Sequence, residues 1–125
     1  MSHNESDFDL NEIYHILRRW AKNANHEIGT YSQLAQDYLD IRSEHIDPHT
    51  ELNKVLGIIN RSLAIIGAPP ISALVVNNKS GVPGNGFWGC STNVPAKPPT
   101  KNKQFEIWTL LVQEVIAYSW PKDLP

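Results

Sequence analysis

Two consecutive prolines in the middle of the chain, Pro69 and Pro70, limit its possible folds more than any other feature. A helix cannot continue through them, because proline lacks a backbone N–H and its ring clashes with the preceding turn. Gly67, just before them, is typical of a helix end. After them, residues 71–76 are a short β-branched run of the kind that forms strands. The chain therefore divides into a helical part and a part that begins with a strand.

Four helices are predicted from apolar periodicity and from the residues that begin or end helices. The first spans residues 9–24. The second is short, two to three turns, and begins where Thr30 and Gln33 have the spacing of a capping box. The third spans residues 48–66 and the last spans residues 103–118. Three tryptophans fall at core positions of these helices or at their ends: Trp20, Trp108 and Trp120.

The segment after the predicted strand is expected to fold back on it as a β-hairpin. Residues 77–81, NNKSG, have the composition of a turn, and residues 82–88, VPGNGFW, would return as an irregular second arm. The glycines do not indicate a phosphate-binding loop, because no helix follows directly and no Lys-Ser or Lys-Thr pair comes after them. Residues 91–103 contain three prolines and three lysines and are predicted to be an exposed loop.

This order of elements is typical of a winged helix. It predicts an α+β fold with three N-terminal helices, a β-hairpin wing and a C-terminal helix, in which the helix before the hairpin commonly enters the major groove of DNA. The length suits one domain over residues 1–125, of which residues 1–8 are expected to be flexible.

Acidic and basic residues are unevenly distributed along the chain, although the net charge is only −2. Residues 1–50 contain nine carboxylates and four cations, whereas residues 52–105 contain six cations and no carboxylate. A surface with cations and no anions favours an anionic partner, because neutralising phosphates drives such binding. An asymmetry of this kind also arises by chance on a solvated surface.

Several segments occur in a distinctive order within residues 28–115: TYSQLA, ALVVNNKSGVPGNGF and WTLLVQEV. This order resembles that of the alkylguanine–DNA alkyltransferases and the alkyltransferase-like proteins, as a match of pattern and not of identity. Residues 31–35 and 69–87 also fit the pattern Y-x-x-L-A followed by P-x-x-x-A-L-V-V-x-x-x-x-G-x-P-G-x-G-F. In this they are similar to small modules found alone or beside restriction-type and other phage-defence proteins.

The resemblance implies a fold and a DNA contact, but not alkyl transfer. The Pro-Cys-His-Arg motif of the alkyltransferases has no counterpart, since residues 71–74 are Ile-Ser-Ala-Leu and the single cysteine, Cys90, lies well beyond them. Where the family has an arginine that enters the base stack, this chain has Asn53 or Lys54. What the resemblance implies is DNA contact by Tyr31 and by the helix around Lys54.

The leading interpretation is a non-catalytic protein that binds duplex DNA, in a phage-defence or counter-defence setting. The predicted contacts lie on the third helix, at the start of the second helix and in the turn: Tyr31, Ser32, Asn53, Lys54, Asn60, Arg61, Asn78, Lys79 and Ser80. The competing interpretation is a protein–protein interaction module, an inhibitor or adaptor, whose acidic first half faces a basic partner or mimics DNA.

No pattern of residues indicates an enzyme, a metal or a cofactor. Nucleophilic catalysis needs a nucleophile with a base beside it, and no histidine lies near Cys90 in the sequence. His45 and His49 flank the start of a helix and would not share one face, and Asp47 between them is better explained as a helix cap.

The sequence also predicts a cytoplasmic protein without a membrane partner. It has no apolar run of about 18 residues. The first residues are acidic and polar, whereas a signal peptide would be basic and then apolar. One cysteine cannot form an internal disulfide framework.

Overall fold

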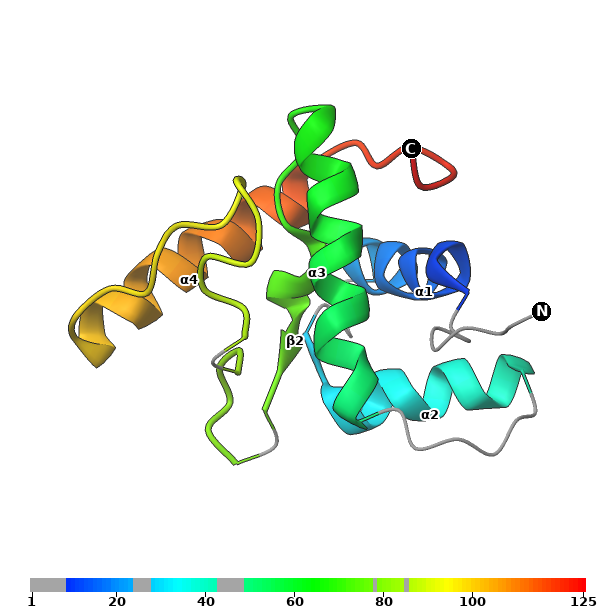
Figure 1. Cartoon of the computed structure of the whole chain (residues 1–125), viewed down its shortest axis with the longest axis horizontal. Helices are drawn as coiled ribbons and strands as arrows, with labels where there is room; N and C mark the ends of the chain where they lie inside the picture. The colour runs from blue at the N-terminus through cyan, green and yellow to red at the C-terminus, as the bar shows by residue number, and fades with distance from the viewer. Residues whose placement is uncertain (1–8, 24–27, 43–48, 78, 85) are drawn as a thin grey trace.

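A computed structural model describes residues 9–23, 28–42, 49–77, 79–84 and 86–125 of the chain (Figure 1). Within these residues the fold is mostly helical, with a very short sheet of two parallel strands. The α-helices are α1 (Leu10–Lys22), α2 (Tyr31–Arg42), α3 (His49–Ile65) and α4 (Lys101–Ala117). The remaining elements are the strands β1 (Gly29–Thr30) and β2 (Val75–Val76) and a 3₁₀ helix, η1 (Ile71–Leu74).

Local side-chain caps explain where the helices begin. The Asp9 carboxylate accepts hydrogen bonds from the N–H groups of Asn11 and Glu12 at the start of α1. The predicted capping box is confirmed, because the Thr30 N–H donates to Gln33 Oε1 at 2.9 Å and the Gln33 N–H donates to Thr30 Oγ1 at 3.1 Å. These contacts start α2 directly after β1.

Gly67 ends α3, as its sequence position predicts. Its φ of 77° is in the left-handed region that favours glycine. The Gly67 N–H donates to Ala64 O and the Ala68 N–H donates to Leu63 O, both at 3.0 Å. This is a Schellman motif, which satisfies the last carbonyls of the helix and turns the chain toward the two prolines.

The sequence predicts a strand over residues 71–76 and a hairpin after it, but only residues 75–76 are a strand, residues 71–74 form η1, and no hairpin follows among the described residues. All four side chains of η1 are buried, so the apolar composition of this run reflects burial and not an extended backbone. Asn77 and Val82 close a turn through a 2.9 Å hydrogen bond from Asn77 N to Val82 O. The described residues that follow, 83–84 and 86–90, form no second arm. Pro83 has no N–H to offer a strand partner.

The strand partner of β2 is β1, from the other half of the chain. The two pair in parallel, with Gly29 opposite Val75 and Thr30 opposite Val76. Parallel strands have their carboxyl ends at the same edge, so α2 and the turn after β2 leave the sheet side by side. Figure 1 shows the start of α2, the start of α3 and this turn at the lower end of the molecule.

η1 lies at the centre of the core. It packs against α1, α3 and α4. The indole Nε1 of Trp108 donates a 2.8 Å hydrogen bond to the carbonyl of Ala73 within it. Trp20, Trp108 and Trp120 are each at most 6% exposed, which confirms their predicted place in the core.

The chain after α4 folds back onto α1. Tyr14 Oη donates to the carbonyl of Pro121 at 2.5 Å, and Asn11 Oδ1 accepts from the N–H of Leu124 at 2.8 Å. Hydrogen bonds from Asn11 and His15 hold the pKa of the Asp123 carboxyl below its usual 3.8. None of the helices among the described residues is long and apolar enough to cross a membrane.

The connection over residues 91–100 differs in part from the exposed loop that its composition predicts. Val94 is only 4% exposed and anchors this connection in the core. α4 begins at Lys101, two residues before its predicted start, because Thr100 Oγ1 accepts a 3.1 Å hydrogen bond from the Lys103 N–H. The exposed part of the connection is therefore shorter than predicted.

We expect Gly29→Ala to destabilise the fold, because a β-carbon at this position would lie 2.5 Å from Cη2 of Trp20. The ring is held in place, since Trp20 Nε1 donates to Asp37 Oδ2 at 3.2 Å. Overpacking of this kind costs about 1–3 kcal/mol in the free energy of unfolding, which urea titration measures.

Gly57→Ala is the matched control. Gly57 lies inside α3, and an added β-carbon would meet only Nη1 at the far end of the Arg61 side chain, at 3.4 Å. Alanine favours a helix interior over glycine by about 1 kcal/mol, so this variant should be as stable as the wild type or more so. Equal urea midpoints for the two variants would contradict the proposed contact between Gly29 and Trp20.

Candidate nucleic-acid interface

One side of α3 faces solvent and carries most of the predicted contacts on this helix. Asn53, Lys54 and Arg61 are all exposed. Arg61 follows Lys54 by seven residues and Asn53 by eight, about two helical turns, so the three side chains lie on one side of α3. The buried face of α3 consists mainly of Leu52, Val55, Leu56, Ile59 and Leu63. α3 therefore presents amide and cationic groups outward from a helix whose other side is packed in the core.

The sequence also predicts a contact from Asn60, but the structure places this side chain in the interior, at 0% exposed. Its Nδ2 donates to Ser72 Oγ at 2.7 Å and contacts Cys90 Sγ at 3.4 Å. Its Oδ1 accepts from the Ser72 N–H at 3.4 Å. Asn60 thus ties α3 to η1 and to the loop that holds Cys90, and does not reach a partner itself.

Residues 84 and 86–90 lie against the start of α2 and against α3 through contacts that the sequence did not reveal. The Gly84 N–H donates to Tyr31 Oη at 3.3 Å, and Arg61 Nη1 donates to the carbonyl of Cys90 at 3.2 Å. A β-carbon on Gly86 would lie 3.7 Å from Asn53. Tyr31, Asn53 and Arg61, which are far apart in sequence, are therefore brought together by one loop.

A small depression marks the place where these elements meet. Its lining comes from α2, α3, η1 and the loop: Tyr31, Asn53, Leu56, Gly57, Ser72, Gly86, Phe87 and Cys90. Burial raises the pKa of the Tyr31 phenol, against a smaller opposite effect of the Gly84 N–H. The phenol therefore stays protonated at neutral pH and can donate a hydrogen bond at this surface.

The other predicted contacts lie at the edges of this surface. Ser32 is exposed in the first turn of α2. Lys79 and Ser80 are exposed in the turn after β2, which is stabilised by a hydrogen bond from the Lys79 N–H to Asn77 Oδ1 at 3.2 Å. Asn78 lies outside the described residues. The turn carries these groups to the same end of the molecule as the start of α3 (Figure 1).

Sequence analysis missed Ser72 and Cys90. Ser72 is the one polar residue in the run from Ile71 to Val76, and a polar residue in such a run needs a buried partner. That partner, Asn60, was recognisable only once α3 and η1 were placed together. Cys90 is half-buried and completes the contact with α3.

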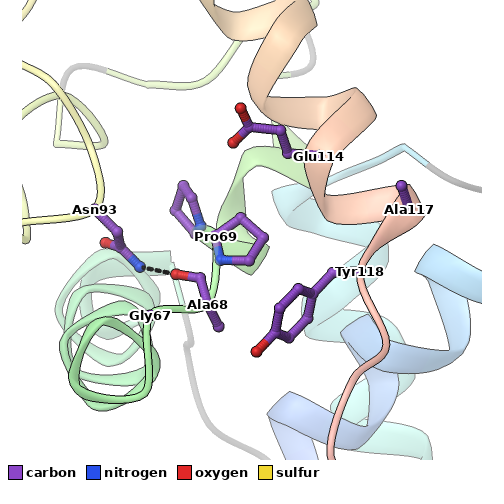
Figure 2. Close-up of a pocket in the computed structure, with 8 residues that line it drawn as sticks. Gly67, Ala68, Pro69, Asn93, Glu114, Ala117 and Tyr118 are labelled. Atoms are coloured by element: carbon purple, nitrogen blue, oxygen red, sulfur yellow. Dashed lines mark hydrogen bonds between the residues drawn. The ribbon is translucent and has the colours of Figure 1, made fainter.

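A larger hollow lies between the end of α3 and the end of α4, with a volume of about 490 Å³. Figure 2 shows Asn93, Pro69, Glu114 and Tyr118 around it. The Asn93 amide is already used within the protein, because it donates to the carbonyls of Ala68 and Asn60 at 3.1 and 3.2 Å. The acidic group that lines it is Glu114, so this hollow does not suit an anion.

The described residues contain no group of metal ligands, and comparison with known proteins identifies no relative, so neither suggests a function. Among the residues that the structure describes, no three His, Cys, Asp or Glu side chains are placed to hold a metal ion. His45 and Asp47 of the histidine-containing motif lie outside those residues. No protein-family model, no curated protein and no solved structure matches the chain. The proposed function therefore depends on the chain's own geometry and charge.

We expect Asn60→Ala to lower the free energy of unfolding by about 1–3 kcal/mol, because it leaves the buried Ser72 N–H and hydroxyl without their partner. Adding Ser72→Ala removes the unpaired hydroxyl, so the double variant should lose less than the sum of the two single losses. Asn53→Ala on the exposed side of α3 should change stability by less than about 0.5 kcal/mol. Urea unfolding of the wild type, the two single variants at Asn60 and Ser72 and the double variant measures the coupling between these residues. Strict additivity of the two single losses would contradict the coupling.

Proposed function

We propose that this protein binds duplex DNA through the exposed side of α3, without catalysis. The observation that carries the proposal is that one loop contacts Tyr31 at the start of α2 and both Asn53 and Arg61 on α3, beside the turn after β2. Arginine and asparagine are the side chains best suited to base edges in the major groove, and lysine to phosphates.

The order of the elements supports a winged-helix-like mode of binding. α2 and α3 are successive packed helices, as in a helix-turn-helix, and the turn over residues 77–82 would take the place of the wing. In this mode α3 enters the major groove. Tyr31 and Ser32 approach one phosphate backbone at the start of α2, and Lys79 and Ser80 contact the other.

Charge supports the same assignment. Every cation proposed at the interface comes from residues 52–105, which contain no carboxylate to oppose a phosphate. The acidic first half is a weaker candidate for a binding face. Two of its carboxylates in the described part of the chain have partners within the fold: Asp9 caps α1 and Asp37 accepts a hydrogen bond from Trp20. These groups act inside the fold, so we favour DNA over a basic protein partner.

The burial of Ser72 supports a binding role without group transfer. This serine stands where the alkyltransferase pattern has its cysteine, and it is only 5% exposed. Its hydroxyl accepts a hydrogen bond from Asn60. A nucleophile needs a neighbouring base to take its proton, and an amide nitrogen that donates a hydrogen bond cannot act as one.

We expect Lys54→Glu and Lys79→Glu each to weaken binding to duplexes of every sequence. Each charge reversal removes a phosphate contact, so the slope of log affinity against log salt should become shallower by about 0.9. Anisotropy of a labelled random duplex, measured between about 50 and 200 mM salt, gives this slope.

Lys122→Glu is the control for these variants, because Lys122 is exposed on the chain after α4, outside the proposed interface. Lys122→Glu changes the net charge by the same amount as Lys54→Glu and Lys79→Glu. If all three variants lose the same affinity, net charge and not the α3 surface would determine binding. An unchanged salt slope in Lys54→Glu and Lys79→Glu would remove these residues from the interface.

A further inference from the structure

A second cavity, of about 640 Å³, lies between the turn after β2 and the start of α4. It borders the proposed duplex interface and shares Ser80 of the turn with it, but no side chain of α2 or α3 lines it. Its walls come from the turn, from the loop around Trp88, from Lys97 and from the first two turns of α4. Its volume is within the range of sites that take small organic ligands.

Aromatic rings form the apolar part of this cavity. Trp88 is half-buried and Phe105 is 56% exposed. The buried Trp108 also lines the cavity; its Nε1–H donates to the carbonyl of Ala73, and its ring centroid lies 5.6 Å from that of Phe105. The core does not need Phe105, since more than half of its surface faces solvent. Exposed aromatic surface beside a cavity is available for stacking.

The charged residues of the cavity are all cationic among the described residues that line it, beside the neutral polar groups of Asn77, Ser80, Asn102 and Gln104. Lys97 and Lys101 line it, and none of the described residues that line it is acidic. The first turn of α4 also lacks an acidic residue and instead holds Lys101 and Lys103. Lysine is unfavourable at this end of a helix, because the helix dipole is positive there. Lys103 has a partner in Glu106 at 3.5 Å, whereas Lys101 faces the cavity.

We infer that this cavity binds one nucleotide unit of a single-stranded nucleic acid, with its base on Phe105 and Trp88 and its phosphate near Lys97 and Lys101. A nucleotide joins an aromatic face to an anion, which matches both parts of the lining. An acidic peptide would pair with the lysines and leave the rings exposed. An apolar ligand would cover the rings and desolvate the lysines without a counter-charge. This site stands independently of duplex binding by α3.

The first test is the affinity of a labelled oligothymidylate of about twelve nucleotides, long enough to cover one small binding site. Phe105→Ala should weaken its binding at least about fivefold, the loss expected for one stacked base. Leu110→Ala is the matched control, because Leu110 is 53% exposed on the same helix but does not line the cavity. Equal affinities of the two variants would overturn the proposal.

Lys101→Glu tests the phosphate contact. An acid at the first position of α4 suits the helix dipole, so this variant should fold at least as well as the wild type. Its binding to the oligothymidylate should weaken, and the salt slope should become shallower by about 0.7, the value for one phosphate of a single strand. No change in affinity or slope would overturn the assignment.

Two further arms separate this site from duplex binding and identify its ligand. Lys54→Glu should lower duplex affinity and leave the oligothymidylate affinity unchanged, so that either proposal can fail alone. If thymidine monophosphate competes with the oligothymidylate, the cavity takes a free nucleotide. If it does not compete, the cavity requires a strand. Each of these results supports the inferred chemistry. If polyglutamate displaces the oligothymidylate when both are at the same concentration, the proposal is overturned, because binding would then need negative charge and no base.

Discussion

The parallel pairing of Gly29–Thr30 with Val75–Val76 is the constraint on which the arrangement of the surface depends. The pair is very short, yet it joins the first helix-forming half of the chain to the segment after the prolines. Because its two strands end at one edge, Tyr31 and Asn77 start their respective elements next to each other. The pairing needs Gly29, since any larger residue would collide with the Trp20 ring. One glycine therefore permits the close approach that brings α2 and the turn together.

A buried polar cluster holds the rest of the surface in place. Asn60, Ser72 and Cys90 lie on α3, on η1 and in the following loop, and hydrogen bonds to and from the Asn60 amide join all three. In a low-dielectric interior such a network is specific, because a misplaced partner leaves a polar group unpaired. The exposed groups Asn53 and Arg61 belong to the same helix as Asn60. Their positions relative to the loop are thereby fixed before any partner arrives.

The sequence predicted the helices because their determinants are local. The Asp9 cap, the capping box of Thr30 and Gln33, and Gly67 each act within a few residues. It failed at the wing because composition there has two explanations. Residues 71–74 are apolar and partly β-branched, as strands are, but tertiary burial among three helices requires this composition equally well. The pairing of β1 with β2 is non-local and has no signature in either dipeptide.

The difference between local and non-local determinants also explains which residues of the candidate site were predicted from the sequence. Exposed cations such as Lys54, Arg61 and Lys79 were found because a carboxylate-free stretch is visible in the sequence. The inward position of Asn60 was not predicted, because a polar residue on an amphipathic helix is expected to face water. The aromatic and cationic cavity was also invisible, because Trp88, Lys97 and Phe105 belong to three separate segments that only the folded chain brings together.

The most direct measurement of the central claim is the map of backbone amide chemical shifts as a random-sequence duplex is added to the ¹⁵N-labelled protein. Our account predicts that the changes concentrate at Tyr31, along α3 from Asn53 to Arg61 and at Lys79 and Ser80. It also predicts that α1 and the segment after α4 change little. Changes centred on α1, or no changes at a salt concentration of about 50 mM, where phosphate contacts are strong, would contradict it.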